Sequence, residues 1–369
     1  MKTGKSILEL ATEIERQARM KKDYLIDTRA MSMVLSDKAA LGTLTPSLEF
    51  GDQLTLIGGT AHDQIGTHVA IPKKYYDRML SEAPGLLVSN VNWWMKQNPS
   101  RQMVRTLDGT ARAFLSDKYR PLDNQQLAEA VLPVLAELGC EVISSEITEK
   151  RLYIKAVDKS VLREIPAGHH MRDGTHTIVK ARQLHPLVCV GNSEIGHGSL
   201  RVDGGTFDGF CTNGAFFGER SMKKYHVGQR HADFSEEQVF TMLSDQSRAL
   251  NDAALWSTIR DVVKGAFDVA RFDALVGKIV GTQEQPLTGD VPKVVELTAA
   301  KFGFNDGERK SVLDHLIRGG DLSRFGLYNA VTRTAEDLVD YDRASEFERM
   351  GGMIVELPAN EWRQLAEAA

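Results

Sequence analysis

The sequence has little cysteine and no long hydrophobic run. Its 369 residues include three cysteines, Cys140, Cys189 and Cys211, and none belongs to a C-x-x-C pair. So sparse a set excludes a disulfide-rich scaffold and is typical of a reducing compartment. No run approaches the roughly 18 apolar residues that a membrane-spanning helix needs. Acidic residues also interrupt the N-terminal segment, where a signal peptide would be apolar. We therefore expect a cytoplasmic protein that does not associate with a membrane.

The sequence also lacks the common catalytic motifs. It has no G-x-x-x-x-G-K-[ST] phosphate loop, no HExxH zinc motif and no G-x-S-x-G nucleophile elbow. Gly196 and Gly198 form a G-x-G without the strand and helix that a dinucleotide site needs. These absences favour a non-catalytic protein without a cofactor over an enzyme. A metal-dependent nuclease is the enzymatic alternative, and its candidate ligands are Asp117, Asp123, Glu146, Glu149 and Glu194.

A strong excess of positive charge is missing as well. Lys and Arg number 45 against 50 Asp and Glu, which gives a formal net charge of −5. This balance excludes a globally basic nucleic-acid binder, so any polyanion site must be a local patch or groove. The segment 333–369 alone holds nine acidic and four basic residues. The rest of the chain is therefore close to neutral, with basic clusters inside it.

Hydrophobic periodicity predicts an α+β fold. Residues 5–20 have helical spacing, and two β-prone runs flank Asp108-Gly109, which is a strong hairpin signal. A helix is predicted over 124–138, and two more strands follow it over 140–147 and 151–157. This order predicts a largely antiparallel sheet with β-hairpins and packed helices.

From Ser235 the pattern becomes helical. A long helix is predicted to begin at Ser235, and others follow up to and beyond Pro358. We therefore predict an α+β domain over 1–232 and an all-α C-terminal domain over 233–369.

The first basic cluster is residues 96–120, with six basic and two acidic residues. Arg105 and Arg112 lie three positions before and after the Asp-Gly turn, so a two-residue hairpin places them on one face. Two guanidiniums on one face suit a phosphate backbone. The alternative is a solvated hairpin face with scattered salt bridges. The predicted nucleic-acid contacts here are Arg101, Arg105, Arg112, Lys118, Tyr119 and Arg120.

The second basic cluster is residues 218–231, with four basic residues against one acidic residue. Basic residues mixed with an aromatic side chain suit a single strand, because cations meet its phosphates and bases stack on the ring. The alternative is a polar loop that joins two domains. The predicted contacts are Lys223, Lys224, Tyr225 and Arg230. Of Trp93 and Trp94, which precede the first basic cluster, we expect at least one to pack in the core or at a hinge.

A zinc site is a third possibility. Cys189, Cys211, His185 and His197 lie within 27 residues of each other. No pair among them has the short spacing of a compact zinc site. Apolar cysteines in strands explain this group better, so we predict no bound metal.

Several sequence blocks resemble the phage- and plasmid-associated domain-of-unknown-function 932 family. They are WW at 93–94, RTLDGTARAFLSDKYRPLDN, SSEITEKRLYIKA, VCVGNSEIGHGSLRV and the late FGLYNAVTRTAEDL. The resemblance covers about residues 20–369 and implies a role in the DNA metabolism of a mobile element. The hairpin, helix and hairpin order of 101–157 is also similar in outline to single-strand annealing proteins of the Rad and Redβ type. Those proteins form rings that hold single-stranded DNA in a basic groove without ATP.

The resulting hypothesis is a homo-oligomeric protein, with a ring as one arrangement, that binds and anneals single-stranded DNA for recombination or replication. Its cations would hold the phosphates, and Tyr119 and Tyr225 would stack on bases. The acidic C-terminal region could contact a single-strand-binding protein or mask the groove. The alternatives are the nuclease and a protein-interaction or host-modulating factor that binds through 235–369.

Overall fold

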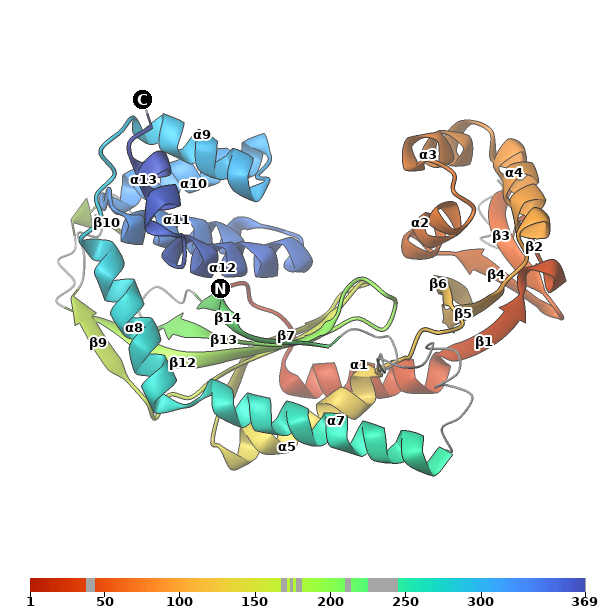
Figure 1. Ribbon diagram of the computed structural model, residues 1–369, viewed down its shortest axis with the longest axis horizontal. Coiled ribbons are helices and arrows are strands. Elements are labelled where there is room, and N and C mark those ends of the chain that lie inside the picture. Colours follow the sequence, from red (N-terminus) through yellow and green to blue (C-terminus); the bar gives the residue numbers. More distant parts are fainter. Residues whose placement is uncertain are drawn as a thin grey trace.

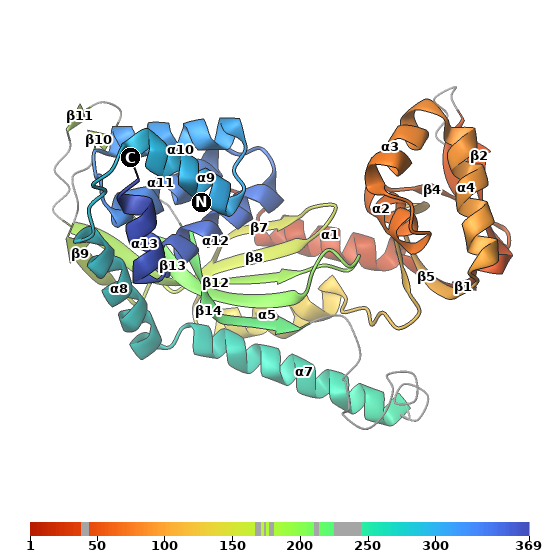
Figure 2. The same ribbon diagram turned by 45° about the horizontal axis from the view of Figure 1, so that its top comes forward.

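The structure is a computed structural model that describes residues 1–37, 44–166, 171–172, 175–176, 181–209, 214–224 and 245–368. Two six-stranded sheets and packed helices form an α+β fold, which confirms the predicted fold class. The first sheet and three helices form an N-terminal lobe, drawn in red, orange and gold in Figure 1. The second, here called the central sheet, is covered by helices on both faces (Figures 1 and 2).

The N-terminal lobe contains six strands in the order β1-β5-β6-β4-β3-β2. They are β1 (Lys22–Asp27), β2 (Met31–Ser36), β3 (Thr45–Phe50), β4 (Gln53–Ile57), β5 (Arg101–Leu107) and β6 (Thr110–Ser116). The 3₁₀ turn η1 (Thr28–Ala30) joins the two edge strands. The helices are α2 (Gly59–His68), α3 (Lys73–Glu82) and α4 (Pro84–Gln97). Met33, Leu48, Ile65, Val91 and Phe114 lie in the core between this sheet and its helices.

The predicted hairpin of β5 and β6 is confirmed, with one irregularity. Asp108 and Gly109 both have positive φ, 52° and 74°, as a tight two-residue turn requires. Arg105 pairs with Ala113 and Thr106 pairs with Ala111, so Arg112 is the extra residue of a β-bulge. The bulge removes the direct pairing of Arg105 with Arg112 that a regular hairpin would have. The expected direct pairing of these two arginines is therefore wrong, although both guanidiniums donate to Glu194 and so meet on one side of the hairpin.

The central sheet has the order β14-β13-β12-β8-β7, and β9 pairs with one end of β12. Its strands are β7 (Glu141–Ile147), β8 (Leu152–Val157), β9 (Arg163–Pro166), β12 (Ala181–Asn192), β13 (Leu200–Asp208) and β14 (Gly214–Lys224). A separate two-stranded ladder joins β10 (Met171–Arg172) and β11 (Thr175–His176). Side chains alternate between the two faces of each strand. On β8, for example, Ile154 belongs to one core and Tyr153 to another.

One face of the central sheet is covered by α1 (Ile7–Met20), α5 (Asn124–Glu137) and α7 (Asp245–Ala266). Figure 2 shows α5 and α7 below the sheet. A capping box of Ser6 and Glu9 begins α1 within a residue or two of the predicted start. Leu10, Val131 and Ile259 from these helices pack against Ile154 and Val190 of the sheet.

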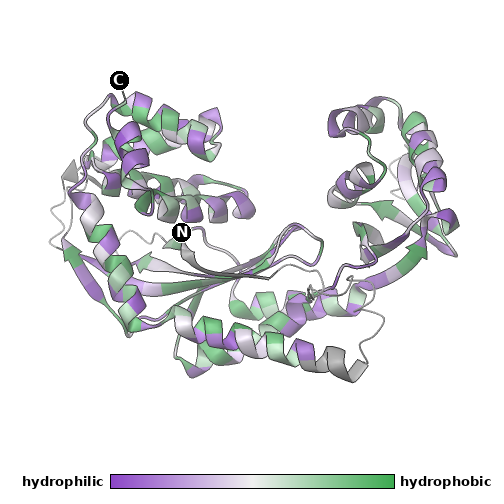
Figure 3. Cartoon of the chain, in the orientation of Figure 1, coloured by the Kyte–Doolittle hydropathy of each residue, from purple (hydrophilic) through white to green (hydrophobic). Residues whose placement is uncertain are grey.

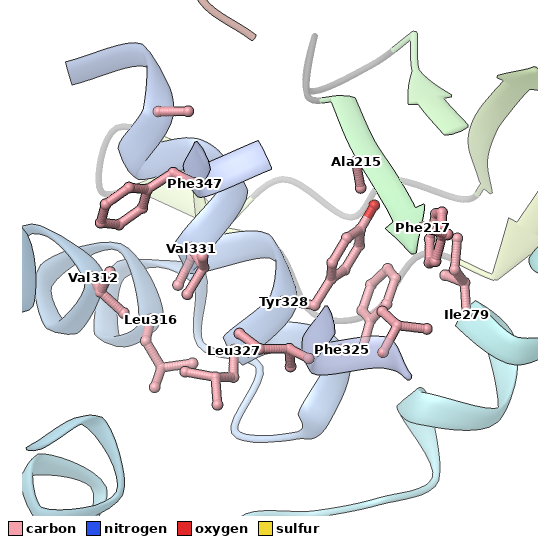
Figure 4. Close-up of a cluster of buried hydrophobic side chains, with 14 of the residues drawn as sticks. Ala215, Phe217, Ile279, Val312, Leu316, Phe325, Leu327, Tyr328, Val331 and Phe347 are labelled. Carbon is pink, nitrogen blue, oxygen red and sulfur yellow. The ribbon is translucent and has the colours of Figure 1, made fainter. Parts of the chain in front are cut away.

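The opposite face is covered by the C-terminal helices. They are α8 (Val269–Gln283), α9 (Val291–Phe302), α10 (Asp306–Gly319), α11 (Arg324–Asp337), α12 (Tyr341–Val355) and α13 (Ala359–Ala366). Hydrophobic and hydrophilic residues alternate along the helices around the sheet (Figure 3). Figure 4 shows how Phe217 of β14 meets Ile279 of α8, close to Phe325 and Tyr328 of α11. The helices and the sheet therefore share one core.

The predicted domain boundary near 232–234 lies outside the described residues. The helices after it share cores with strands before it, on both faces of the central sheet. The N-terminal lobe, by contrast, has a core of its own. Among the described helices, none combines the length and the apolar character needed to cross a membrane.

Candidate functional site

Arg105, a predicted phosphate contact, is fully buried, with 0% of its surface exposed. Its Nε and Nη2 donate to the two carboxylate oxygens of Asp23 at 2.8 and 3.0 Å, and Nη2 also donates to Asp123 at 2.9 Å. Nη1 donates to the carbonyl oxygen of Glu194 at 2.7 Å. The alternative of a solvated hairpin face is therefore wrong for Arg105, and carboxylates of the protein occupy the donors that a phosphate contact would need.

Arg112 lies in the same network. Its Nη2 donates to Oε2 of Glu194 at 2.5 Å, and Oε1 of Glu194 accepts the Asn124 backbone N–H at 2.7 Å. Lys21 Nζ lies 2.7 Å from Asp123 and 3.5 Å from Glu194. We call this set the interlobe joint, because it connects the N-terminal lobe to the rest of the molecule. It consists of Lys21, Asp23, Arg105, Arg112, Asp123 and Glu194.

The joint balances three cationic and three anionic side chains. Burial alone would raise the pKa of Asp123, but Lys21 and Arg105 outweigh it and hold that pKa below its usual value. Burial likewise opposes the charge of Arg105, yet the hydrogen bonds to Asp23 raise its pKa above the ordinary value. Both shifts favour the charged forms of Asp123 and Arg105, and each guanidinium of the joint donates to a carboxylate, so we assign the joint a structural role.

The other predicted contacts are dispersed. Tyr119 is half-buried, and its hydroxyl donates to the Ser193 carbonyl oxygen at 3.2 Å. Arg120 pairs with Asp252 of α7, while Arg101 and Lys118 are exposed. Lys223 and Lys224 end β14, where the backbone alone is described, and Tyr225 and Arg230 lie outside the described residues.

Trp93 and Trp94 of α4 are 62% and 43% exposed. Neither of them packs in the core, so that part of the expectation is wrong. Leu87, Val91 and Met95 form the buried stripe of that helix. The two tryptophans lie off this stripe.

A cavity of about 220 Å³ lies between the central sheet and α12, and it is rich in cationic side chains. We call it the anion pocket. The β-ladder places Tyr153, Gly191 and Arg201 side by side on β8, β12 and β13. Its lining residues are Lys150, Arg151, Tyr153, Cys189, Gly191, His197, Arg201, Asp203, Phe216, Asp342, Ser345, Glu346 and Arg349.

Among the described residues, two of the pocket's three guanidiniums have no carboxylate partner. Arg349 pairs with Asp203. Arg151 donates to the His197 carbonyl oxygen, and Arg201 Nε donates to Ser199 Oγ at 3.4 Å. Within the described ranges, neither Arg151 nor Arg201 forms an ion pair.

The positive charge of Arg201 is destabilised where it lies. Burial, and then the positive charges of Arg349 and Arg151, lower the pKa of Arg201 below its ordinary value. The pKa of His197 is lowered by burial and by the nearby charges of Lys150 and Arg151. A bound anion would relieve this repulsion, so the arrangement suits an anionic ligand.

A buried ion pair lies next to the pocket. Lys155 Nζ is 2.6 Å from Glu348, and both side chains are fully buried. Burial opposes the charge of Lys155, but attraction to Glu348 raises its pKa above the usual value. Burial also raises the pKa of Cys189 to about 12, so Cys189 is a neutral thiol at physiological pH. Lys155, Glu348 and Cys189 form the buried floor of this region, and we assign no reaction to them.

The loop 193–199, between β12 and β13, connects the joint to the pocket. Glu194 belongs to the joint, whereas His197 lines the pocket. The Ile195 carbonyl oxygen accepts a hydrogen bond from Gln64 of α2 at 2.7 Å. Gly198 has φ +132°, and a Cβ there would collide with the Arg151 guanidinium. Glycine is therefore needed for Arg151 to lie against this loop.

The groups considered for metal binding meet at most in pairs among the described residues: Asp123 and Glu194 both contact Lys21 in the interlobe joint, and Cys189 and His197 both line the anion pocket. Glu146 pairs with Lys5, and His185 Nδ1 is 2.9 Å from the Val161 carbonyl oxygen. Cys211 lies outside the described residues. In the described part of the chain, no three His, Cys, Asp or Glu side chains gather closely enough to hold a metal ion.

Comparison with known proteins gives no relative. No protein-family model, curated protein or solved structure matches the chain. The resemblance to the domain-of-unknown-function 932 family therefore stays a prediction.

Sequence reasoning missed Lys150, Arg151, Arg201 and Arg349 as a group. One signal was present in the strand LRVDGG, where Arg201 and Asp203 alternate with Leu200 and Val202. Charged residues at every second position of a strand indicate a polar site when both faces of the sheet are covered. Both faces of this sheet are covered. The contribution of Arg349 had no such signal, because it comes from an acidic helix.

Proposed function

We propose that this chain binds single-stranded DNA and anneals complementary strands without ATP, acting as a homo-oligomer on a mobile element. The observation that carries the proposal is the pair Arg151 and Arg201. These are guanidiniums without carboxylate partners, among the described residues, in a partly buried pocket. Guanidinium is well suited to phosphate, because its fixed donors form paired, charge-assisted hydrogen bonds.

The positions of other cationic residues support a binding path longer than one phosphate. Lys150 is exposed beside the pocket. Lys223 is the ladder partner of Arg201 on β14, the edge strand of the central sheet. Cationic positions thus continue from the pocket towards that edge. We propose Lys223, Lys224, Tyr225 and Arg230 as contacts there, and Arg101 and Lys118 as contacts from the N-terminal lobe.

The mechanism needs no chemical step by the protein. Cations hold the strand by its phosphates and leave the base edges accessible to a second strand. Base pairing supplies the free energy of annealing, so ATP is not required. Several protomers side by side would extend the bound segment. The acidic C-terminal helices are the proposed contact for a single-strand-binding protein.

The test is a titration of a single strand of about 40 nucleotides, with an internal fluorophore and a phosphate at each end, over a salt series without ATP or metal. We expect binding by an oligomer, salt dependence and faster pairing with the complementary strand. The double variant Arg151→Gln/Arg201→Gln should reduce the slope of log affinity against log salt by about 1.4, at about 0.7 per lost contact.

The matched control is Arg29→Gln/Arg78→Gln, which removes two exposed arginines of the N-terminal lobe. Its slope should equal that of the wild type. Absence of binding at low salt would overturn the proposal, and so would equal slopes for the two double variants. Strand cleavage that depends on added Mg²⁺ or Mn²⁺ would support the nuclease instead.

A further inference from the structure

We propose that the anion pocket receives the terminal phosphate monoester of a DNA strand, rather than a phosphodiester from its interior. The inference rests on the proposed function for the strand itself. It adds which part of the strand enters the pocket.

The first argument is the closed base of the pocket. Cys189, Phe216 and Ser345 line the cavity and are 4%, 1% and 7% exposed. Lys150 and Glu346 line it as well, and both are exposed, so they mark its mouth. A strand that continues in both directions needs two exits from a pocket, whereas a strand end needs one. A cavity with a buried floor therefore suits the end of a strand better than its interior.

The second argument is charge. Asp203 neutralises Arg349, and Arg343 neutralises Glu346. Asp342 accepts hydrogen bonds from Tyr153 at 2.9 Å and from Thr148 at 3.1 Å. These neutral hydroxyls leave the charge of Asp342 in place, and Lys150 at the mouth offsets it. Arg151 and Arg201 then remain as an excess of two positive charges, and neither forms an ion pair with a carboxylate in the described part of the chain. A phosphate monoester carries about −1.5 to −2 at neutral pH, and an internal diester carries about −1. The pocket matches the monoester.

The third argument is the supply of donors and space. The buried Oγ of Ser345 lacks a hydrogen-bond partner within the described residues, although Ser345 lines the cavity. A hydroxyl left unpaired is costly unless a ligand pairs with it. Gly191 has no side chain, so the surface of the sheet between Tyr153 and Arg201 is open to the cavity. A Cβ there would come no closer than 3.6 Å to the Leu152 carbonyl oxygen, so a methyl group would enter the cavity without displacing protein atoms.

The experiment compares three strands of one sequence, about 20 nucleotides long, with a 5′-phosphate, a 3′-phosphate or neither. We expect one phosphorylated end to bind about tenfold more tightly than the unphosphorylated strand, as charge-assisted hydrogen bonds would give. Arg201→Gln should bring that ratio to about one. Gly191→Ala should do the same while keeping every charge, and thermal unfolding would verify that both variants fold. Arg163→Gln, an exposed arginine paired with Asp273, is the control and should keep the full ratio.

The outcomes separate this inference from the proposed function. Equal binding of all three strands by the wild type overturns the inference and leaves the proposed function standing. If the phosphorylated strand still binds about tenfold more tightly than the unphosphorylated strand in both Arg201→Gln and Gly191→Ala, the terminal phosphate does not bind in this pocket. Deoxyadenosine 5′-monophosphate that binds as tightly as the phosphorylated strand overturns the strand end as the source of the phosphate. If the unphosphorylated strand does not bind at all, the proposed function fails, even if a phosphorylated strand binds.

Discussion

The interlobe joint and the anion pocket both gather arginines from distant segments, but they differ in the carboxylates beside them. In the joint, Arg105 and Arg112 form ion pairs with Asp23, Asp123 and Glu194. In the pocket, Arg151 and Arg201 form none with the described residues. A guanidinium that is already paired holds the protein together, and one that is unpaired and partly buried is available to a ligand.

The difference shows that charge density along the chain does not predict which cations are available. Residues 96–120 carry six basic residues against two acidic ones. Folding supplies carboxylates from β1, the start of α5 and the loop 193–199 to the two arginines of the hairpin. The pocket residues are scattered in sequence, yet folding brings Arg151, Arg201 and Arg349 together. Whether a cationic side chain is available to a ligand depends on how many carboxylates lie beside it in the folded protein.

The largest predicted effect concerns the joint. Arg105→Met leaves Asp23 and Asp123 without their buried partner, and removing one member of a buried ion pair costs about 3–5 kcal/mol. We expect a loss of this size in the free energy of unfolding, measured by urea denaturation. Arg163→Met removes an exposed arginine and should cost no more than about 1 kcal/mol. A loss below about 1 kcal/mol for Arg105→Met would contradict the structural role of the joint.

A smaller effect on stability is predicted for Glu194, which belongs to the interlobe joint and lies in the loop that connects it to the anion pocket. Glu194→Gln keeps the shape of the side chain but removes the charge that pairs with Arg112 and Lys21. We expect stability to fall by about 1–3 kcal/mol, the usual cost of unpairing a buried charged hydrogen bond. Because Glu194 lies in the loop 193–199, affinity for a single strand should fall as well. Glu149→Gln, at an exposed position of the neighbouring turn, should change neither quantity.

Local signals in the sequence predicted the elements that depend on local interactions. The first helix, the Asp108-Gly109 turn and the helix predicted over 124–138 all appear within two residues of their predicted positions. The helix α8 was missed, and so was α2, whose glycines and threonines are weak helix formers stabilised by packing. The bulge at Arg112 had no local signal.

The site was less predictable than the fold, because it depends on contacts between distant segments. The pairing of Arg105 with Asp23 joins two strands separated by three helices. The pocket needs α12 to close over β8, β12 and β13. A single sequence contains the residue types but not these juxtapositions.

Acid should affect the joint without affecting the charges of the pocket arginines. The pKa of Asp123 in the folded protein lies below its ordinary value of 3.8, so its contribution to stability is complete above that value. That contribution is lost as the pH falls through the lower, folded-state pKa. Each such group contributes at most about 1.4 kcal/mol per pH unit. Asp123→Asn should therefore be less stable at neutral pH, and its stability should fall less steeply below pH 3.8 in urea titrations. Parallel curves for the two proteins would exclude Asp123 as a charged partner of Arg105.

The smallest predicted effect on stability is the most informative contrast with Arg105. Burial and the guanidiniums of Arg349 and Arg151 outweigh the attraction of Asp203, so the pKa of Arg201 is lowered and its charge is disfavoured in the folded protein. Arg201→Gln removes that repulsion, so the free energy of unfolding should stay within about 1 kcal/mol of the wild type or rise slightly. Inorganic phosphate should raise the unfolding temperature of the wild type more than that of the variant, because a ligand stabilises the state that binds it. A loss as large as that of Arg105→Met would show that Arg201 is a structural residue, and the contrast between joint and pocket would fail.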